Sequence, residues 1–395
     1  MDQNNNFWYQ KDKENYLPVF NRIPLAFSKA KGATIFDVEG REYLDLLAGI
    51  AVLNAGHCHP TIVEAIQEQA ANLMHISNFF VSEPQMQLAE KLSELSGLKY
   101  VFFSNSGAES NEGAIKIARK YARKNGRGGV VVSMKGCFHG RTLATIATGN
   151  RPSQIDFSPL PNGFTQVELN NFDCLKTIIS NHTAAIIVEP VQGEGGIHEA
   201  KPEYLRKLRA LCDEKNIVLI YDEIQCGMGR IGQPFGWQHS GVQPDIITLA
   251  KGLGGGFPIG AIVTNEKVGN AMDFGDHGTT FGGNPLGCAA ANAYLKVMEE
   301  EKLPQKALET GNWLMEKLNQ LKSDYNFIKD VRGVGLMIGV EFDFETKPLF
   351  RKLLDKGVIA NATAGNVLRL VPPLNIKQEQ LSYFLEILKT ELDNV

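Results

Sequence analysis

Long apolar runs and paired cysteines are both missing from this chain of 395 residues. No apolar stretch approaches the roughly 20 residues that a membrane-spanning helix needs, which argues against an integral membrane protein. The cysteines are dispersed and show no CxxC spacing, a pattern typical of free thiols in a reducing compartment, so we expect a cytoplasmic protein. They are Cys58, Cys137, Cys174, Cys212, Cys226 and Cys288.

An excess of positive charge is missing as well. Lys and Arg together number 40 against 44 Asp and Glu, and the net charge is −4. A nucleic-acid-binding protein normally presents a basic face, so the charge balance argues against that class. Residues 1–6 are polar and lack the basic and apolar regions of a secretory signal.

Short apolar runs alternate with stretches of helical periodicity after about residue 60. This alternation predicts an α/β fold with a mostly parallel sheet covered on both faces. The expected strands are residues 100–103, 129–133, 184–188, 217–221, 246–250 and 261–264. The expected helices between them include residues 109–124 and 202–214.

The chain is long enough for a large domain and a smaller one. We expect residues 61–293 to form the large, ligand-binding domain and residues 294–395 to form a C-terminal small domain, to which residues 1–60 contribute. In the C-terminal part, residues 331–342 and 367–371 are predicted strands, and residues 381–392 are a predicted closing helix.

Asp222 and Lys251 each stand at the end of an apolar strand-like run. Ligands of parallel sheets gather at the carboxyl ends of strands. A lysine in a low-dielectric site has a lowered pKa, which frees its amine as a nucleophile toward carbonyls. A carboxylate at a neighbouring strand end could serve the ring nitrogen of pyridoxal phosphate (PLP). This pair therefore indicates Schiff-base chemistry.

Other polar positions admit two interpretations each. Ser106 can cap the helix that follows it, and the backbone N–H groups of that helix end suit a phosphate, but an ordinary capped helix explains the same pattern. Phe138 could stack on a flat ring and Arg141 could bind a carboxylate; a packed phenylalanine and a surface arginine would look the same. Arg369 lies inside an apolar run and needs a partner such as Glu194 or an anionic ligand.

His57 and His59 flank Cys58 and resemble a metal cluster. A structural zinc site needs four ligands, and no second ligand pair accompanies these residues, so we expect loop packing and no metal.

Together these segments resemble the class III PLP-dependent aminotransferases over nearly the whole chain. Each segment is a weak signal by itself, but the set occurs in the family's order and spacing. The segments are GHCHP at 56–60, NSGAE at 105–109, FHGR at 138–141, EPVQGEGG at 189–196, DEIQ at 222–225, LAKG at 249–252 and TTFGGNP at 279–285.

The resemblance implies the fold type I architecture of PLP enzymes, with a seven-stranded mostly parallel sheet and a small domain built from both chain ends. It also implies a homodimer with active sites at the interface. By position, Lys251 would be the Schiff-base lysine, Asp222 would keep the pyridine nitrogen protonated, and Gln225 would bond the ring hydroxyl. Phe138 would stack on the ring.

The phosphate of PLP would be bound at the start of the helix that follows residue 106. Ser106, Gly107 and Ala108 are the implied phosphate-binding residues. Thr280 of the partner subunit would complete this group.

The substrate is also implied by position. Arg141 would bind a substrate carboxylate, and Arg369 would bind the α-carboxylate of glutamate, with Glu194 as its alternate partner. Thr279 and Ile50 would line the substrate site, and the apolar Ile50 suits an acylated side chain. We expect N-acetylornithine as amino donor and 2-oxoglutarate as acceptor. Succinylornithine, ornithine or 4-aminobutyrate remain alternative donors, and a PLP enzyme that does not transaminate is an alternative of another class.

Overall fold

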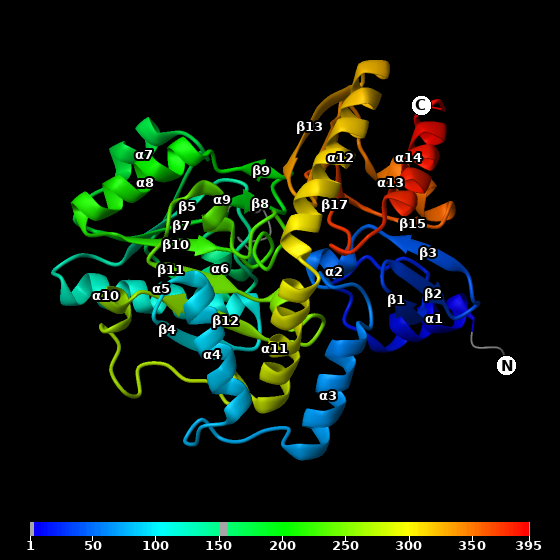
Figure 1. The fold of residues 1–395 in the computed structure, drawn as a ribbon. Helices are drawn as coiled ribbons and strands as arrows, with labels where there is room; N and C mark the ends of the chain where they lie inside the picture. The colour runs from blue at the N-terminus through cyan, green and yellow to red at the C-terminus, as the bar shows by residue number, and fades with distance from the viewer. Residues whose placement is uncertain (1–3, 150–155, 395) are drawn as a thin grey trace.

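The computed structural model describes residues 4–149 and 156–394. Its centre is a seven-stranded sheet in the order β4-β12-β11-β10-β7-β5-β6 (Figure 1). The strands are β4 (Tyr100–Ser104), β5 (Val130–Met134), β6 (Phe164–Val167), β7 (Thr183–Val188), β10 (Val218–Asp222), β11 (Ile246–Leu249) and β12 (Gly260–Thr264). Neighbouring strands are parallel except where β12 pairs antiparallel with β11 and β4. The predicted mostly parallel α/β fold is thus confirmed.

Helices cover both faces of this sheet because its central strands are apolar on both sides. Every residue of β7, β10, β11 and β12 is buried. Ile187 and Ile220 pack with α5 (Gly107–Lys124) on one face, and their chain neighbours Ile186 and Leu219 pack with α8 (Pro202–Lys215) on the other. Successive side chains of a strand point to opposite faces of the sheet, which is why neighbouring residues pack against different helices.

The remaining helices are short or surround the sheet. They are α1 (Asn5–Asn15), α2 (Ala48–Ala51), α3 (Pro60–Asn72), α4 (Glu83–Ser96), α6 (Leu143–Ala147), α7 (Phe172–Ile178), α9 (Gly236–Ser240), α10 (Glu266–Gly269), α11 (Pro285–Glu300), α12 (Leu303–Asp324), α13 (Lys347–Asp355) and α14 (Gln378–Leu392). A 3₁₀ turn, η2 (Lys251–Gly254), follows β11.

Both chain ends lie together beside the large sheet (Figure 1). One sheet combines β1 (Phe27–Lys31), β2 (Thr34–Asp37) and β3 (Glu42–Asp45) with β15 (Val358–Ile359), which pairs parallel with β3. A second contains β13 (Ile328–Val334), β14 (Met337–Phe342), β17 (Val367–Leu370) and β16 (Asn361–Thr363). A third pairs β8 (Val191–Gln192) with β9 (His198–Glu199). The division at residues 60 and 293 remains a proposal, and residue 293 falls within α11.

Two local features differ from the sequence prediction. Residues 331–342 are not one strand, because the chain reverses at Gly335, with φ of 56°, and β13 pairs with β14 as a hairpin. The closing helix expected at residues 381–392 begins three residues earlier, since α14 spans Gln378–Leu392.

The segment after β3 contains an unusual left-handed turn. Ala48, Gly49, Ile50 and Ala51 have φ values of 50°, 64°, 67° and 60°. For residues other than glycine this conformation costs about 1–2 kcal/mol each, because Cβ approaches the following carbonyl oxygen. The surrounding structure must therefore hold this turn in place.

Candidate active site

A cavity of about 470 Å³ opens at the carboxyl ends of β10 and β11, where parallel sheets bind ligands. Its wall contains most of the predicted site residues. Those that line it are Ser106, Gly107, Ala108, Phe138, Arg141, Glu194, Asp222, Gln225 and Lys251. Residues far apart in sequence thus converge, as the prediction required.

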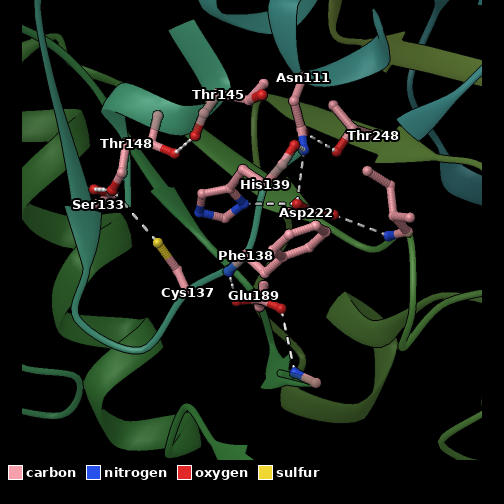
Figure 2. A network of polar contacts seen from close by, with 12 residues as sticks. Asn111, Ser133, Cys137, Phe138, His139, Thr145, Thr148, Glu189, Asp222 and Thr248 are labelled. Atoms are coloured by element: carbon pink, nitrogen blue, oxygen red, sulfur yellow. Dashed lines mark hydrogen bonds and ion pairs between the residues drawn. The ribbon is translucent and has the colours of Figure 1, made fainter. Parts of the chain in front are cut away.

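Asp222 is the most firmly held group in the cavity (Figure 2). Its side chain is 3% exposed, and Oδ2 lies 2.6 Å from Nδ1 of His139 and accepts a 2.8 Å hydrogen bond from Nδ2 of Asn111. Thr248 in turn donates to Oδ1 of Asn111 at 2.7 Å, and Ile224 donates its backbone N–H to Oδ1 of Asp222. The carboxylate is therefore fixed in orientation before any ligand binds.

The sequence by itself indicates no role for His139 or Asn111. His139 lies in the FHGR segment, and Asn111 lies one turn into α5. Burial by itself lowers the pKa of His139, but Cys137 and the Asp222 carboxylate outweigh burial and raise that pKa well above its ordinary value. His139 and Asp222 thus form a buried imidazolium–carboxylate pair.

Lys251 begins η2 in the left-handed region, with φ of 45°. Its side chain is partly buried and reaches the cavity. Burial is the main cause that lowers its pKa, and the nearby Arg369 lowers it further, while Glu194 acts in the opposite direction. A lowered pKa increases the fraction of neutral, nucleophilic amine, as the sequence predicted.

Glu189, the first residue of the 189–196 segment, also lines the cavity. Its carboxylate accepts backbone N–H groups from Phe138 and Gly193, both at 3.2 Å. Burial raises the pKa of Glu189 to about 7, with Asp222 adding to the rise and His139 opposing it. Glu189 therefore connects the backbone at Phe138, the predicted ring-stacking residue, to the backbone just before Glu194.

The start of α5 forms one end of the cavity. The first turn of an α-helix leaves backbone N–H groups without partners inside the helix, and these suit an anion. Ser106 caps the helix by accepting from the N–H of Glu109 at 3.3 Å. Gly140, with φ of 138°, lets the FHGR segment approach Ala108 so closely that a Cβ there would lie 2.7 Å from the Ala108 Cβ.

Arg369 and Glu194 form the ion pair expected from sequence. Nη1 of Arg369 lies 2.6 Å from Oε1 of Glu194, and the arginine is 1% exposed. The same nitrogen donates to the carbonyl of Gly193 at 3.1 Å, and Nη2 donates to Asn361 at 2.9 Å. Arg369 does not line the cavity itself but lies directly behind Glu194, which does.

Three other predicted residues lie outside the cavity of the single chain. Val52, rather than Ile50, reaches the wall. Thr279 accepts hydrogen bonds from Asn105 and from the N–H of Gly282, and Thr280 is exposed beside it. The role of Thr280 as a residue of the partner subunit stays a prediction.

Comparison with known proteins gives the family. The Aminotransferase class-III model matches residues 17–392. This chain belongs to the class-III aminotransferases. Since enzymes of this class use PLP, the buried carboxylate of Asp222, the amine of Lys251 and the start of α5 fit the pyridine nitrogen, the aldehyde and the phosphate of that cofactor in chemical type.

The similarity extends over complete chains. The acetylornithine aminotransferase of Methanocaldococcus jannaschii is 52% identical over 98% of both chains, and that of Caldanaerobacter subterraneus is 45% identical over 97% of this chain and 98% of its own. Among solved structures, a Toxoplasma gondii ornithine aminotransferase described with PLP at its active site has a TM-score of 0.96 at 33% identity, covering 100% of this chain and 95% of its own. The acetylornithine aminotransferase of Elizabethkingia anophelis has a TM-score of 0.89 at 31% identity, covering 99% and 100%.

Among residues 4–149 and 156–394, no group of His, Cys, Asp and Glu side chains is arranged to hold a metal ion. Within the same described ranges, no helix combines the length and the apolar character needed to cross a membrane.

Proposed function

We propose that this enzyme transfers the terminal amino group of N-acetylornithine to 2-oxoglutarate, giving N-acetylglutamate semialdehyde and glutamate. The observation that carries the proposal is the Arg369–Glu194 pair behind the cavity that contains Lys251 and Asp222. The relatives named above as acetylornithine aminotransferases, at 45% and 52% identity, support the choice of donor.

The ion pair explains how one site can serve both substrates. The carbon that carries the terminal amine of N-acetylornithine has no carboxylate, so Glu194 can remain on Arg369 while this donor reacts. Glutamate and 2-oxoglutarate carry an α-carboxylate, which would displace Glu194 and bind Arg369 in its place. Arg141, at the cavity wall, would bind the second carboxylate.

When bound, PLP supplies an electron sink for the carbon from which a proton is removed. Asp222, held between His139 and Asn111, would keep a proton on the pyridine nitrogen. Lys251 would take the proton from the substrate carbon and return it, because a lowered pKa increases the fraction of neutral amine that can accept one.

The ring and the phosphate would be held by the remaining cavity residues. We propose that Phe138 stacks on the ring and that Gln225 bonds the ring hydroxyl. The N-terminal turn of α5, with Ser106, Gly107 and Ala108, would bind the phosphate.

We also propose that the enzyme is a homodimer. Phe79, Phe80, Val81 and Phe281 are 93%, 64%, 77% and 60% exposed, which is unusual for large apolar side chains. Asn78 joins their two segments by donating to the carbonyls at residues 279 and 282, both at 3.1 Å. A second copy on this surface would bury the apolar side chains and receive Thr280. A cytoplasmic location is proposed on the six free thiols.

The decisive experiment offers the holoenzyme 2-oxoglutarate with N-acetylornithine, succinylornithine, ornithine or 4-aminobutyrate, and measures glutamate. We expect the highest kcat/KM with N-acetylornithine. A preference for ornithine would favour a second candidate function, ornithine transamination. The similarity to two ornithine aminotransferase structures, at TM-scores of 0.95 and 0.96, supports that candidate. A lack of glutamate with all four donors would refute the assignment.

A further inference from the structure

Asp45 and His57 form a buried contact that the chemistry above does not use. Nε2 of His57 lies 2.7 Å from Oδ2 of Asp45, whose side chain is 2% exposed. The other oxygen, Oδ1, accepts the backbone N–H groups of Leu47 and Ala48 at 2.8 and 2.9 Å. One carboxylate thus joins a histidine to the entrance of the left-handed turn at residues 48–51.

The turn depends on such an anchor. Ile50 is β-branched, and a left-handed backbone is especially unfavourable for such a residue. Within the turn, Ala51 donates to the carbonyl of Leu47 at 3.0 Å and Val52 donates to that of Ala48 at 2.8 Å. The two acceptors, Leu47 and Ala48, are also the residues whose N–H groups bond to Asp45. The carboxylate therefore holds in place the backbone to which the turn is hydrogen-bonded.

His57 connects this carboxylate to a rigid neighbour. Its backbone N–H and carbonyl both bond Gly32, at 2.8 and 3.0 Å, in an isolated antiparallel bridge. Gly32 lies in the loop between β1 and β2. Asp45 is therefore held from two directions, by the turn and by the β1–β2 loop.

The far end of the turn leads into the active-site cavity. Val52 lines the cavity together with Lys251, while Ala51 is buried against Val191 and Ile197. A change in the turn would move Val52 and with it this part of the cavity wall. We propose that Asp45 and His57 are positioning residues that hold the left-handed turn and thereby set the preference for an acylated over a free ornithine side chain. This inference rests on the proposed function.

The neighbouring histidine provides a matched control. His59 makes the same kind of contact, with Nε2 at 2.8 Å from Oε1 of Glu301, just after the end of α11. It does not touch the turn and does not line the cavity. A loss of packing in the 56–60 segment would appear in both His57 and His59 variants, whereas an effect on the turn would appear only in the first.

The test compares the ratio of kcat/KM for N-acetylornithine to that for ornithine in the holoenzyme. Asp45→Ala removes all three contacts and should lower this ratio about tenfold, chiefly through the KM of N-acetylornithine. Asp45→Asn keeps an oxygen for Leu47 and Ala48 and should restore part of the loss. His59→Gln should leave the ratio unchanged, and cofactor absorbance should match the parent in every variant.

A second pair of variants keeps the proposal testable if Asp45→Ala does not fold. His57→Gln leaves the bonds to the turn intact and should shift the ratio in the same direction by less. Ala48→Gly combined with Asp45→Asn should recover the ratio further, because glycine adopts a left-handed φ without strain. An unchanged ratio in folded Asp45→Ala or His57→Gln would overturn the proposal. The ratio measured for the parent enzyme tests the proposed function, whereas the change of that ratio in the variants tests the positioning role. The two proposals can therefore fail separately.

Discussion

Replacing His139 with phenylalanine removes the buried partner of Asp222 and keeps a ring in its place. The two side chains are 0% and 3% exposed. Removing one partner of a buried ion pair costs about 3–5 kcal/mol. In the described part of the chain Nε2 of His139 has no hydrogen-bond partner, so the substitution also removes a desolvation cost of about 1–3 kcal/mol. We expect the free energy of unfolding of the apoprotein to fall by about 2 kcal/mol, the difference between these two contributions.

The pH dependence of this loss follows from the raised pKa of His139. The folded protein holds the proton more tightly than the unfolded chain does. The stabilisation is therefore complete below the ordinary pKa of 6.5 and is lost as the pH rises through the folded-state pKa. The difference between parent and His139→Phe should accordingly be largest below pH 6.5 and narrow as the pH rises above it.

Urea unfolding of the apoproteins measures both quantities, and His239→Phe is the control. His239 lies 3.0 Å from Glu199, but the two side chains are 33% and 35% exposed. Such an exposed pair contributes at most about 1 kcal/mol. A loss for His139→Phe no larger than that of the control, or a difference that widens with pH, would refute the reasoning.

Four further predictions concern single residues. Lys251→Met should abolish transamination. In the apoprotein the same substitution should raise the free energy of unfolding near neutral pH, because burial lowers the Lys251 pKa. This gain should shrink as the pH approaches 10.5, and urea unfolding measures it. Glu194→Gln should lower the KM for 2-oxoglutarate, measured by steady-state kinetics, since it weakens competition for Arg369. Arg230→Met should lower the free energy of unfolding, measured in urea, by several kcal/mol. The substitution leaves three buried oxygens without this donor, at a cost of about 1–3 kcal/mol each. Phe79→Asp should shift the enzyme toward monomer in analytical ultracentrifugation.

Each of these has a contrary outcome. Residual turnover by Lys251→Met would transfer its role to another lysine, and an unchanged KM in Glu194→Gln would remove the ion pair from substrate exchange. Full stability of Arg230→Met would show that burying its charge costs as much as its bonds contribute. A Phe79→Asp enzyme that sediments as the parent does would place the subunit contact elsewhere.

The layered fold and the placement of Asp222 and Lys251 at its strand ends were predictable from the sequence. Continuous apolar runs such as 217–221 are typical of strands buried on both faces, and polar residues that follow parallel strands gather at one edge of the sheet. Asp222 and Lys251 were therefore predictable in both place and kind. The Arg369–Glu194 pair was predictable as well, because an arginine inside the apolar run 367–371 needs a partner such as Glu194.

Only the tertiary structure decided what supports these groups. The contact between His139 and Asp222 joins residues 83 positions apart, and no periodicity in the chain reports such a pairing. The left-handed turn has an ordinary sequence in which Ile50 favours other conformations, so its shape depends on Asp45 and on contacts beyond the segment. For the same reason the wall of the cavity contains Val52 rather than the predicted Ile50. Local preference determines elements, whereas the packing of distant segments determines which side chains reach the site.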